Sequence, residues 1–162
     1  MEVTFEWDGP DPQEIAERFD ALNDALASNL ESAGEDIAEL ISAQAAENAP
    51  EDQAELKNSI DEVVEVTAGA MLRVAVGTDD TPKGAVHEFG ADPFWPPISP
   101  LRDWAARNLG DPDAAWFVQR KIAEEGLPAQ EWLSLAFKEH EDTAFDMLEN
   151  AIENAFEEAG LA

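Results

Sequence analysis

The feature that most constrains the fold is a run of apolar residues spaced three and four apart between Pro12 and Pro50. This spacing places the apolar side chains on one face of an α-helix. Asp11 can cap the helix with Pro12 at its first position, and Pro50 ends it near Asn48. The pattern predicts a helix about 54 Å long, which Gly34 could kink or divide. Its apolar residues are Ile15, Phe19, Leu22, Leu26, Leu30, Ile37, Leu40 and Ile41.

Shorter patterns predict a small antiparallel sheet. Val3, Phe5 and Trp7 alternate with polar residues, which is typical of a strand with one buried face. Residues 62–66 and 72–76 are predicted to form a hairpin. Its open face or free edge is available to a second copy of the chain.

The second half of the chain is predicted to be helical. Ser99 and Pro100 can begin a helix that ends at Gly110, and residues 111–125 form another. Residues 131–158 form a long helix. We expect its buried stripe to consist of Leu135, Phe145, Leu148, Ile152 and Phe156.

The predicted fold class is therefore α+β, with a short antiparallel sheet packed against a long N-terminal helix and a helical C-terminal half. We expect a single domain over residues 1–162. Its parts are residues 1–80 (strand, long helix and hairpin), 81–98 (proline and aromatic loop), 99–126 (helical insertion) and 127–162 (C-terminal helix).

The loop over residues 92–99 contains candidate partner-contact residues. Its prolines stiffen the backbone, so Phe94 and Trp95 present apolar area at low entropic cost. The alternative is that both rings pack into the chain's own core. The candidate contact residues are Phe94, Trp95, Pro96, Pro97, Arg102 and Arg107.

The densest group of basic residues follows this loop and consists of Arg102, Arg107, Arg120 and Lys121. In an acidic homo-oligomer these residues could pair with carboxylates of the next subunit. The alternative is ion pairing within the chain, at about 0–1 kcal/mol for each pair.

We expect no catalytic, metal or cofactor site, and therefore no enzyme. His87 and Glu88 do not form the His-Glu-x-x-His motif, because Ala91 stands where the second histidine belongs. His140 lies among acidic residues of a predicted helix face. The chain has no cysteine, which excludes disulfides and thiolate ligands.

The charge of the chain is the second strong signal. There are 37 acidic and 9 basic residues, for a net charge of −28, whereas 44% apolar content argues against disorder. Such acidity fits a DNA mimic or adaptation to molar salt, and it opposes specific nucleic-acid binding. Salt adaptation is favoured by scarce lysine and by two series of like charges one helical turn apart. These series are Glu31, Glu35 and Glu39, and Glu149, Glu153 and Glu157.

The acidic residues are unevenly distributed. Residues 61–137 contain 13 acidic and 6 basic residues, so the least acidic region carries the aromatic loop. Either this surface is buried against a neighbour, or a core region has fewer surface positions. No apolar run is long enough for a transmembrane span, and the first residues lack the features of a signal peptide.

Several motifs resemble the tail-completion family of long-tailed phages. Residues 85–90 read Ala-Val-His-Glu-Phe-Gly, followed by Phe-Trp-Pro-Pro at 94–97 and Leu-Arg-Asp-Trp at 101–104. Residues 49–60 and 126–133 resemble two further boxes of the family. The departures are Ala54 where glycine is usual, and Gln130 and Glu131 where arginine and proline are usual.

The resemblance implies a structural virion protein of the tail or neck that acts in tail assembly and head–tail joining. It would assemble in the host cytoplasm, contact the tail terminator and the connector, and form a homo-oligomer around the tail axis. Together with the charge, it suggests a virus of an extreme halophile. The alternatives are a head-closure or connector protein, and a soluble acidic DNA mimic or inhibitor.

We predict that the isolated protein loses helicity and melts at a lower temperature in about 0.1 M than in about 3 M potassium chloride, because salt screens the like charges. Circular dichroism at both concentrations measures this difference. Equal helicity and equal melting temperatures would contradict salt adaptation and favour the DNA mimic.

Overall fold

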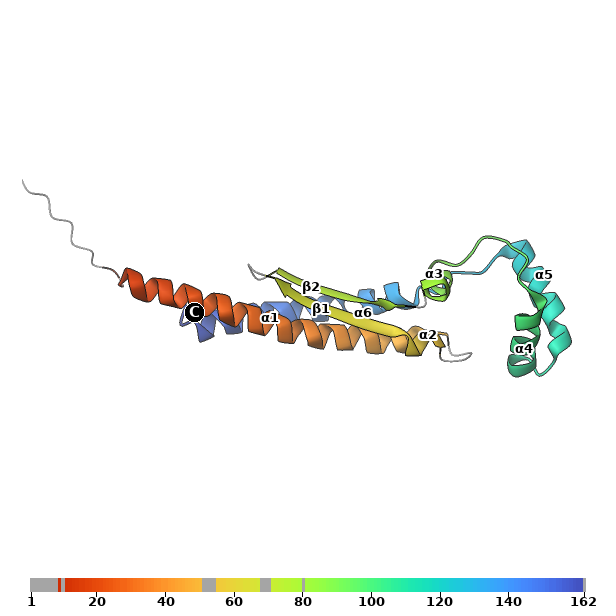
Figure 1. Cartoon of the computed structure of the whole chain (residues 1–162), viewed down its shortest axis with the longest axis horizontal. Coiled ribbons are helices and arrows are strands. Elements are labelled where there is room, and N and C mark those ends of the chain that lie inside the picture. The colour runs from red at the N-terminus through yellow and green to blue at the C-terminus, as the bar shows by residue number, and fades with distance from the viewer. Residues whose placement is uncertain (1–8, 10, 51–54, 68–70, 80, 162) are drawn as a thin grey trace, which may run out of the picture. The chain divides into compact units, whose positions relative to one another are not determined.

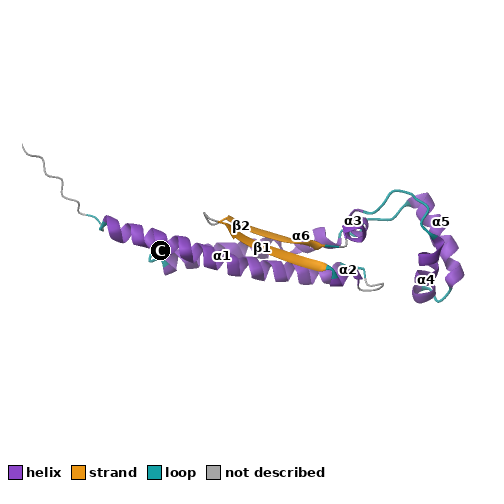
Figure 2. Ribbon diagram, viewed as in Figure 1, coloured by secondary structure: helices purple, strands orange, loops and turns teal. Residues whose placement is uncertain are grey.

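The computed structural model describes residues 9, 11–50, 55–67, 71–79 and 81–161. Its fold is α+β, with helices predominating, and the strands among the described residues form one hairpin (Figure 2). The predicted strand around Phe5 lies outside the described residues. In chain order the elements are α1 (Pro12–Asn48), α2 (Glu55–Asn58), β1 (Ile60–Thr67), β2 (Met71–Thr78), α3 (Thr81–Phe89), α4 (Ile98–Asn108), the short 3-10 helix η1 (Pro112–Ala114), α5 (Ala115–Glu125) and α6 (Trp132–Glu158) (Figure 1).

The chain divides into two compact units, and α1, the hairpin and α6 each contribute to both. Unit 1 comprises Met1–Ile37, Val63–Val74 and Asp142–Ala162, and unit 2 comprises Ala38–Glu62 and Ala75–Glu141. No helix in the described ranges is long and apolar enough to cross a membrane.

The long helix predicted from the apolar spacing is confirmed as α1. Asp11 Oδ1 accepts a hydrogen bond from the backbone N–H of Gln13 at 2.9 Å, as expected of a cap. Gly34 does not divide the helix. A Cβ there would lie 2.8 Å from carbon atoms of both Leu72 and Val64, so glycine allows the hairpin to approach the helix closely.

The hairpin is a two-stranded antiparallel sheet, and both strands are longer than predicted. In unit 1, Val66 and Leu72 pack against the buried residues Leu30 and Ala33 of α1. The other face carries the exposed ion pair between Glu65 and Arg73, with an N–O distance of 3.2 Å. It also carries Val63 and Met71, both exposed.

The expected buried stripe of α6 is wrong for four of its five residues. Alanines are buried in its place: Ala151 packs with Leu30, and Ala155 and Ala159 pack with Leu22. Small side chains let helix backbones approach closely, so the alanine face contacts α1 and the larger residues remain outside. Leu148 is half-buried, whereas the exposed members are Leu135 (37%), Phe145 (64%), Ile152 (41%) and Phe156 (38%).

The predicted loop over residues 81–98 is wrong in its first half, which forms α3. Pro82 is compatible with the first turn of a helix, and α3 continues through Gly84 and ends before Gly90. Ser99 does not cap the next helix, because α4 begins at Ile98 after Pro97 and has no side-chain cap. The two helices predicted between Ser99 and Glu125 are confirmed as α4 and α5.

Candidate functional site

Two segments that lie far apart in the sequence pair with each other in unit 2. Ala91 and Leu127 form an antiparallel bridge, with N–O distances of 2.9 and 2.8 Å. The backbone N–H of Gln130 donates to the carbonyl of His87 at 2.8 Å. We call these paired segments, residues 84–91 and 126–134, the clasp.

Two glycines make the clasp sterically feasible. Gly90 and Gly126 have φ angles of 75° and 77°, in the left-handed region that favours glycine. A Cβ on Gly90 would collide with the carbonyl oxygen of Leu127, and a Cβ on Gly126 with that of Ala91. Both positions therefore require glycine for backbone conformation and for close approach.

Glu88 links the two segments through its carboxylate, and only 7% of the residue is exposed. The carboxylate accepts hydrogen bonds from the backbone N–H groups of Leu133 at 2.8 Å and Ser134 at 3.0 Å, and from the Ser134 hydroxyl. These N–H groups belong to the first turn of α6, where no preceding helical carbonyl is available. Glu88 thus caps α6 with a negative charge from a distant part of the chain.

Trp132 fills the interior of the clasp and is 1% exposed. Its indole N–H donates to the carbonyl of Gly84 at 3.2 Å, which satisfies its polar atom. The Asn48 side chain donates to the Trp132 carbonyl at 3.2 Å, so the clasp is also joined to the end of α1. His87 Nδ1 lies 3.1 Å from Gln130 Oε1, which gives this histidine a structural partner.

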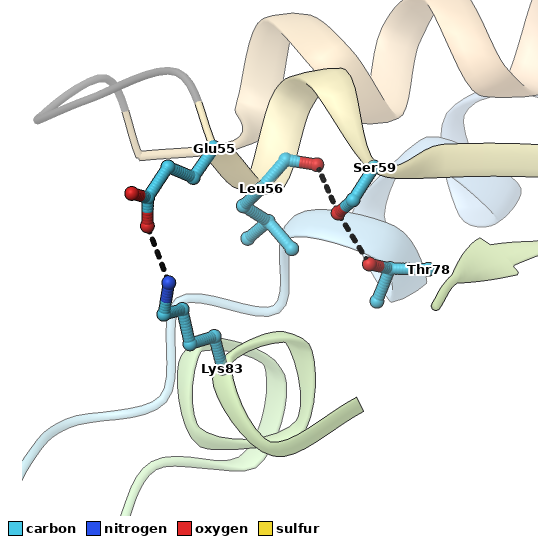
Figure 3. Close-up of polar contacts among 5 residues, drawn as sticks. All are labelled: Glu55, Leu56, Ser59, Thr78 and Lys83. Carbon is cyan, nitrogen blue, oxygen red and sulfur yellow. Dashed lines mark hydrogen bonds and ion pairs between the residues drawn. The ribbon is translucent and has the colours of Figure 1, made fainter. Parts of the chain in front are cut away.

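Polar contacts hold α2 and α3 next to the hairpin base, as Figure 3 shows. Ser59 Oγ donates to the Leu56 carbonyl at 2.9 Å and lies 2.6 Å from Thr78 Oγ1. Lys83 of α3 forms an ion pair with Glu55 of α2. The Lys83–Glu55 ion pair joins α2 to α3, which carries one side of the clasp.

The clasp closes the base of the helical insertion, residues 92–125, which we call the insert. Ala105 and Ala115 are fully or almost fully buried where α4 and α5 pack together. The Gln119 side chain donates to the Pro96 carbonyl at 2.8 Å and so ties the aromatic loop to α5. The loop is therefore held at the clasp and at α5.

Most of the predicted partner-contact residues are exposed. Trp95 is 67% exposed and Phe94 is 41% exposed, so the two rings are not packed into the core of unit 2. Pro97, Arg102 and Arg107 are also exposed. Pro96 is buried in the single chain and its carbonyl accepts a hydrogen bond from Gln119, so its contact with a partner stays a prediction.

Further exposed aromatic residues were not singled out by the sequence patterns. Trp116 and Phe117 at the start of α5 are 57% and 76% exposed, and Phe89 in the clasp is 78% exposed. The one sequence feature that could have indicated exposed rings here is the adjacent pair Trp116 and Phe117, which follows a short turn rich in aspartate and alanine. Exposed apolar residues in such number are typical of an interaction surface.

For two of the four basic residues, Arg120 and Lys121, the structure shows ion pairs within the chain. Arg120 pairs with Glu124 at 2.8 Å and Lys121 with Glu125 at 3.8 Å, each one turn along the same helix. The intrachain alternative is therefore confirmed for these two residues. The hydrogen bond from Arg120 to Glu124 raises the pKa of the Arg120 guanidinium.

A cleft of about 670 Å³ lies in unit 2 beside the aromatic loop. Most of its lining side chains are apolar, and charged residues from α2, α3 and α4 lie among them. The apolar lining consists of Pro50, Leu56, Phe94, Pro96, Pro100, Leu101, Trp104, Val118, Ile122 and Leu127, and the polar lining of Glu55, Lys83, His87, Asp103, Arg107 and Gln130.

Comparison of the chain with models of known families, with curated proteins and with solved structures finds no match. Across the described ranges, histidine, aspartate and glutamate side chains do not gather in groups of three or more that could hold a metal ion. The described part of unit 2 combines exposed aromatic rings with a mostly apolar cleft on the clasped insert.

We predict that Glu88→Ala lowers the free energy of unfolding by about 2 kcal/mol, because it removes a charged cap and leaves N–H groups of α6 without an acceptor. Glu139→Ala, at an exposed position on the same helix, is the matched control and should change stability little. Denaturant titration followed by circular dichroism measures both. Equal midpoints for the two variants would contradict this role of Glu88.

Proposed function

We propose that this protein is a structural virion protein of the tail or neck, a tail-completion adaptor that acts in tail assembly and head–tail joining of a virus infecting an extreme halophile. It works by presenting a surface to its neighbours, and no covalent bond is made or broken. The proposed neighbours are the tail terminator, the connector and further copies of the same chain around the tail axis.

The clasp supports this proposal because it unites two of the boxes that carry the family resemblance. Residues 85–90 and residues 126–133 lie far apart in the sequence but pair through backbone hydrogen bonds. Glu88 from one box and Trp132 from the other are buried in this pairing. These two boxes thus serve one structural purpose, which is to hold the base of the insert.

The exposure of Phe94 and Trp95 is the observation that carries the proposal. A large aromatic side chain on a stiff loop can fill a pocket on a partner with little loss of conformational entropy. Such residues commonly dominate the affinity of an interface. The loop is held by the Ala91–Leu127 bridge and by Gln119, so it is pre-organised before any partner binds.

The charge also fits an assembly role at high salt. Screening at molar salt shortens the range of repulsion to about 3 Å, so copies with net charge −28 can approach one another. The exposed aromatic residues of the insert then supply attraction between copies or with other virion proteins.

We predict that Trp95→Ala leaves the protein folded but blocks joining, because it removes the largest exposed ring of the loop. Particles assembled with this variant in place of the wild-type chain should give filled heads and separate tails in electron micrographs. Phe19→Ala is the matched control, since Phe19 is an aromatic residue of α1 that is 59% exposed.

Complete particles at wild-type yield with Trp95→Ala would contradict the proposed contact. If tails fail to assemble at all with Trp95→Ala, Trp95 acts in tail assembly, before heads and tails join. A lowered melting temperature of Trp95→Ala would show instead that the ring stabilises the folded chain.

A further inference from the structure

We propose that Trp116 and Phe117 of one copy of this chain enter the apolar cleft of unit 2 in a second copy. We call these two residues the knob. This inference deepens the assembly role proposed above and rests on it only in requiring that copies meet. The knob does not include Trp95, so the two proposals can be tested separately.

The first observation is the cleft. Its volume is about 670 Å³, within the range of about 300–1,000 Å³ that is typical of pockets which bury a ligand. Leu101 and Trp104 of α4 and Val118 of α5 belong to its lining and are only half-buried. Apolar surface of both helices therefore remains in contact with solvent, and an apolar side chain that filled the cleft would remove it from water.

The second observation is the knob. Trp116 and Phe117 are 57% and 76% exposed in the first turn of α5. Their backbone is held on both sides: Asp111 Oδ1 accepts a hydrogen bond from the N–H of Asp113 at 2.9 Å, and Ala115 is buried with 1% exposed. Large aromatic rings on a fixed backbone lose little conformational entropy on docking, and each can bury about 150–250 Å².

Helix geometry directs the knob away from the cleft of its own chain. Successive side chains of an α-helix are about 100° apart around its axis. Val118 and Ile122 line the cleft, whereas Trp116, two residues before Val118, points to nearly the opposite side of α5. The lining contains neither Trp116 nor Phe117. Knob and cleft thus lie on different sides of the insert, and a knob that fills the cleft comes from another copy.

Charge makes a second copy a suitable occupant of this cleft. The whole chain has 37 acidic and 9 basic residues, about four to one. The cleft lining has equal numbers, with Glu55 and Asp103 against Lys83 and Arg107. The knob follows an acidic turn at residues 111–113, so most of the surface of another copy would repel it. At the cleft the two basic side chains offset the carboxylates of this turn.

The proposed contact is heterologous, because the knob and the cleft are different surfaces. Each copy has one of each, so the contact can repeat from one copy to the next and give an assembly larger than a dimer. A variant without the knob still offers its cleft, and a variant with a blocked cleft still offers its knob. Mixing two such variants therefore restores one contact and no more.

Two substitutions and their matched controls test this contact. Trp116→Ala removes the larger ring of the knob, and its control is Phe145→Ala, which removes a ring of unit 1 that is 64% exposed. Leu101→Glu places a carboxylate in the cleft, and its control is Leu109→Glu, at a residue 53% exposed and outside the lining. Circular dichroism establishes that each variant is folded. Pro100→Glu, at an exposed position of the lining, takes the place of Leu101→Glu if that variant melts at a lower temperature.

We expect the unmodified chain and both controls to sediment at high salt as a species larger than a dimer. Trp116→Ala and Leu101→Glu should each sediment as a monomer. Their equimolar mixture should give a dimer with one copy of each, because the cleft of the first variant and the knob of the second are intact. Native mass spectrometry reads this composition, since the variants differ in mass.

Three results would overturn the proposal. The first is an unmodified chain that is monomeric at high salt, and the second is Trp116→Ala that sediments like the unmodified chain. The third is a mixture of the two folded variants that contains no dimer. If joining still depends on Trp95 in any of these cases, the proposed function stands without the knob. If the mixture behaves as expected but joining does not depend on Trp95, the proposed function fails and the contact between copies stands.

Discussion

The hydrogen bonds between the Glu88 carboxylate and the first turn of α6 are the interaction on which unit 2 depends. They join α3 to α6 at the point where the insert leaves the chain and returns to it. Gly90 and Gly126 permit this approach, and the Trp132 ring fills the space behind it. Without the cap, the N–H groups at the start of α6 would lack an acceptor, and the backbone hydrogen bonds Ala91–Leu127 and Gln130–His87 would hold the two ends of the insert without the support of the Glu88 carboxylate.

The second organising feature is that α6 packs against α1 through alanines and leaves its larger side chains exposed. Ala33, Ala151 and Ala155 are buried in unit 1, while Phe145 is exposed on the same helix as the last two. Close packing of alanines leaves the aromatic and branched side chains outside. A chain with net charge −28 keeps such residues in water at a cost, which burial against neighbours would remove. Molar salt screens the repulsion between acidic surfaces, so a chain with this charge can still bury its exposed apolar residues against a neighbour.

The fold class, α1, the hairpin and the insert followed from apolar spacing and from prolines, since these act locally. The side of α6 that faces α1 did not follow from the sequence pattern. The spacing of large apolar residues predicted that they are buried, whereas the two helices pack closely enough that alanines occupy the interface. The exposure of Phe94 and Trp95 agreed with the prediction from the proline-rich loop, whereas Pro96 is buried. The role of Glu88 had no sequence signal: it is one carboxylate among 37 acidic residues, and its partners are more than 40 positions away.

The central claim is that the aromatic loop of the insert becomes buried against another protein on assembly. Hydroxyl-radical footprinting, read by mass spectrometry, compares Trp95 in the free protein with Trp95 in the purified particle. Trp132, which is 1% exposed in the folded chain, serves as the internal reference. We expect Trp95 to be oxidised readily in the free protein and protected in the particle, while Trp132 is protected in both. Equal oxidation of Trp95 in the two states would contradict it.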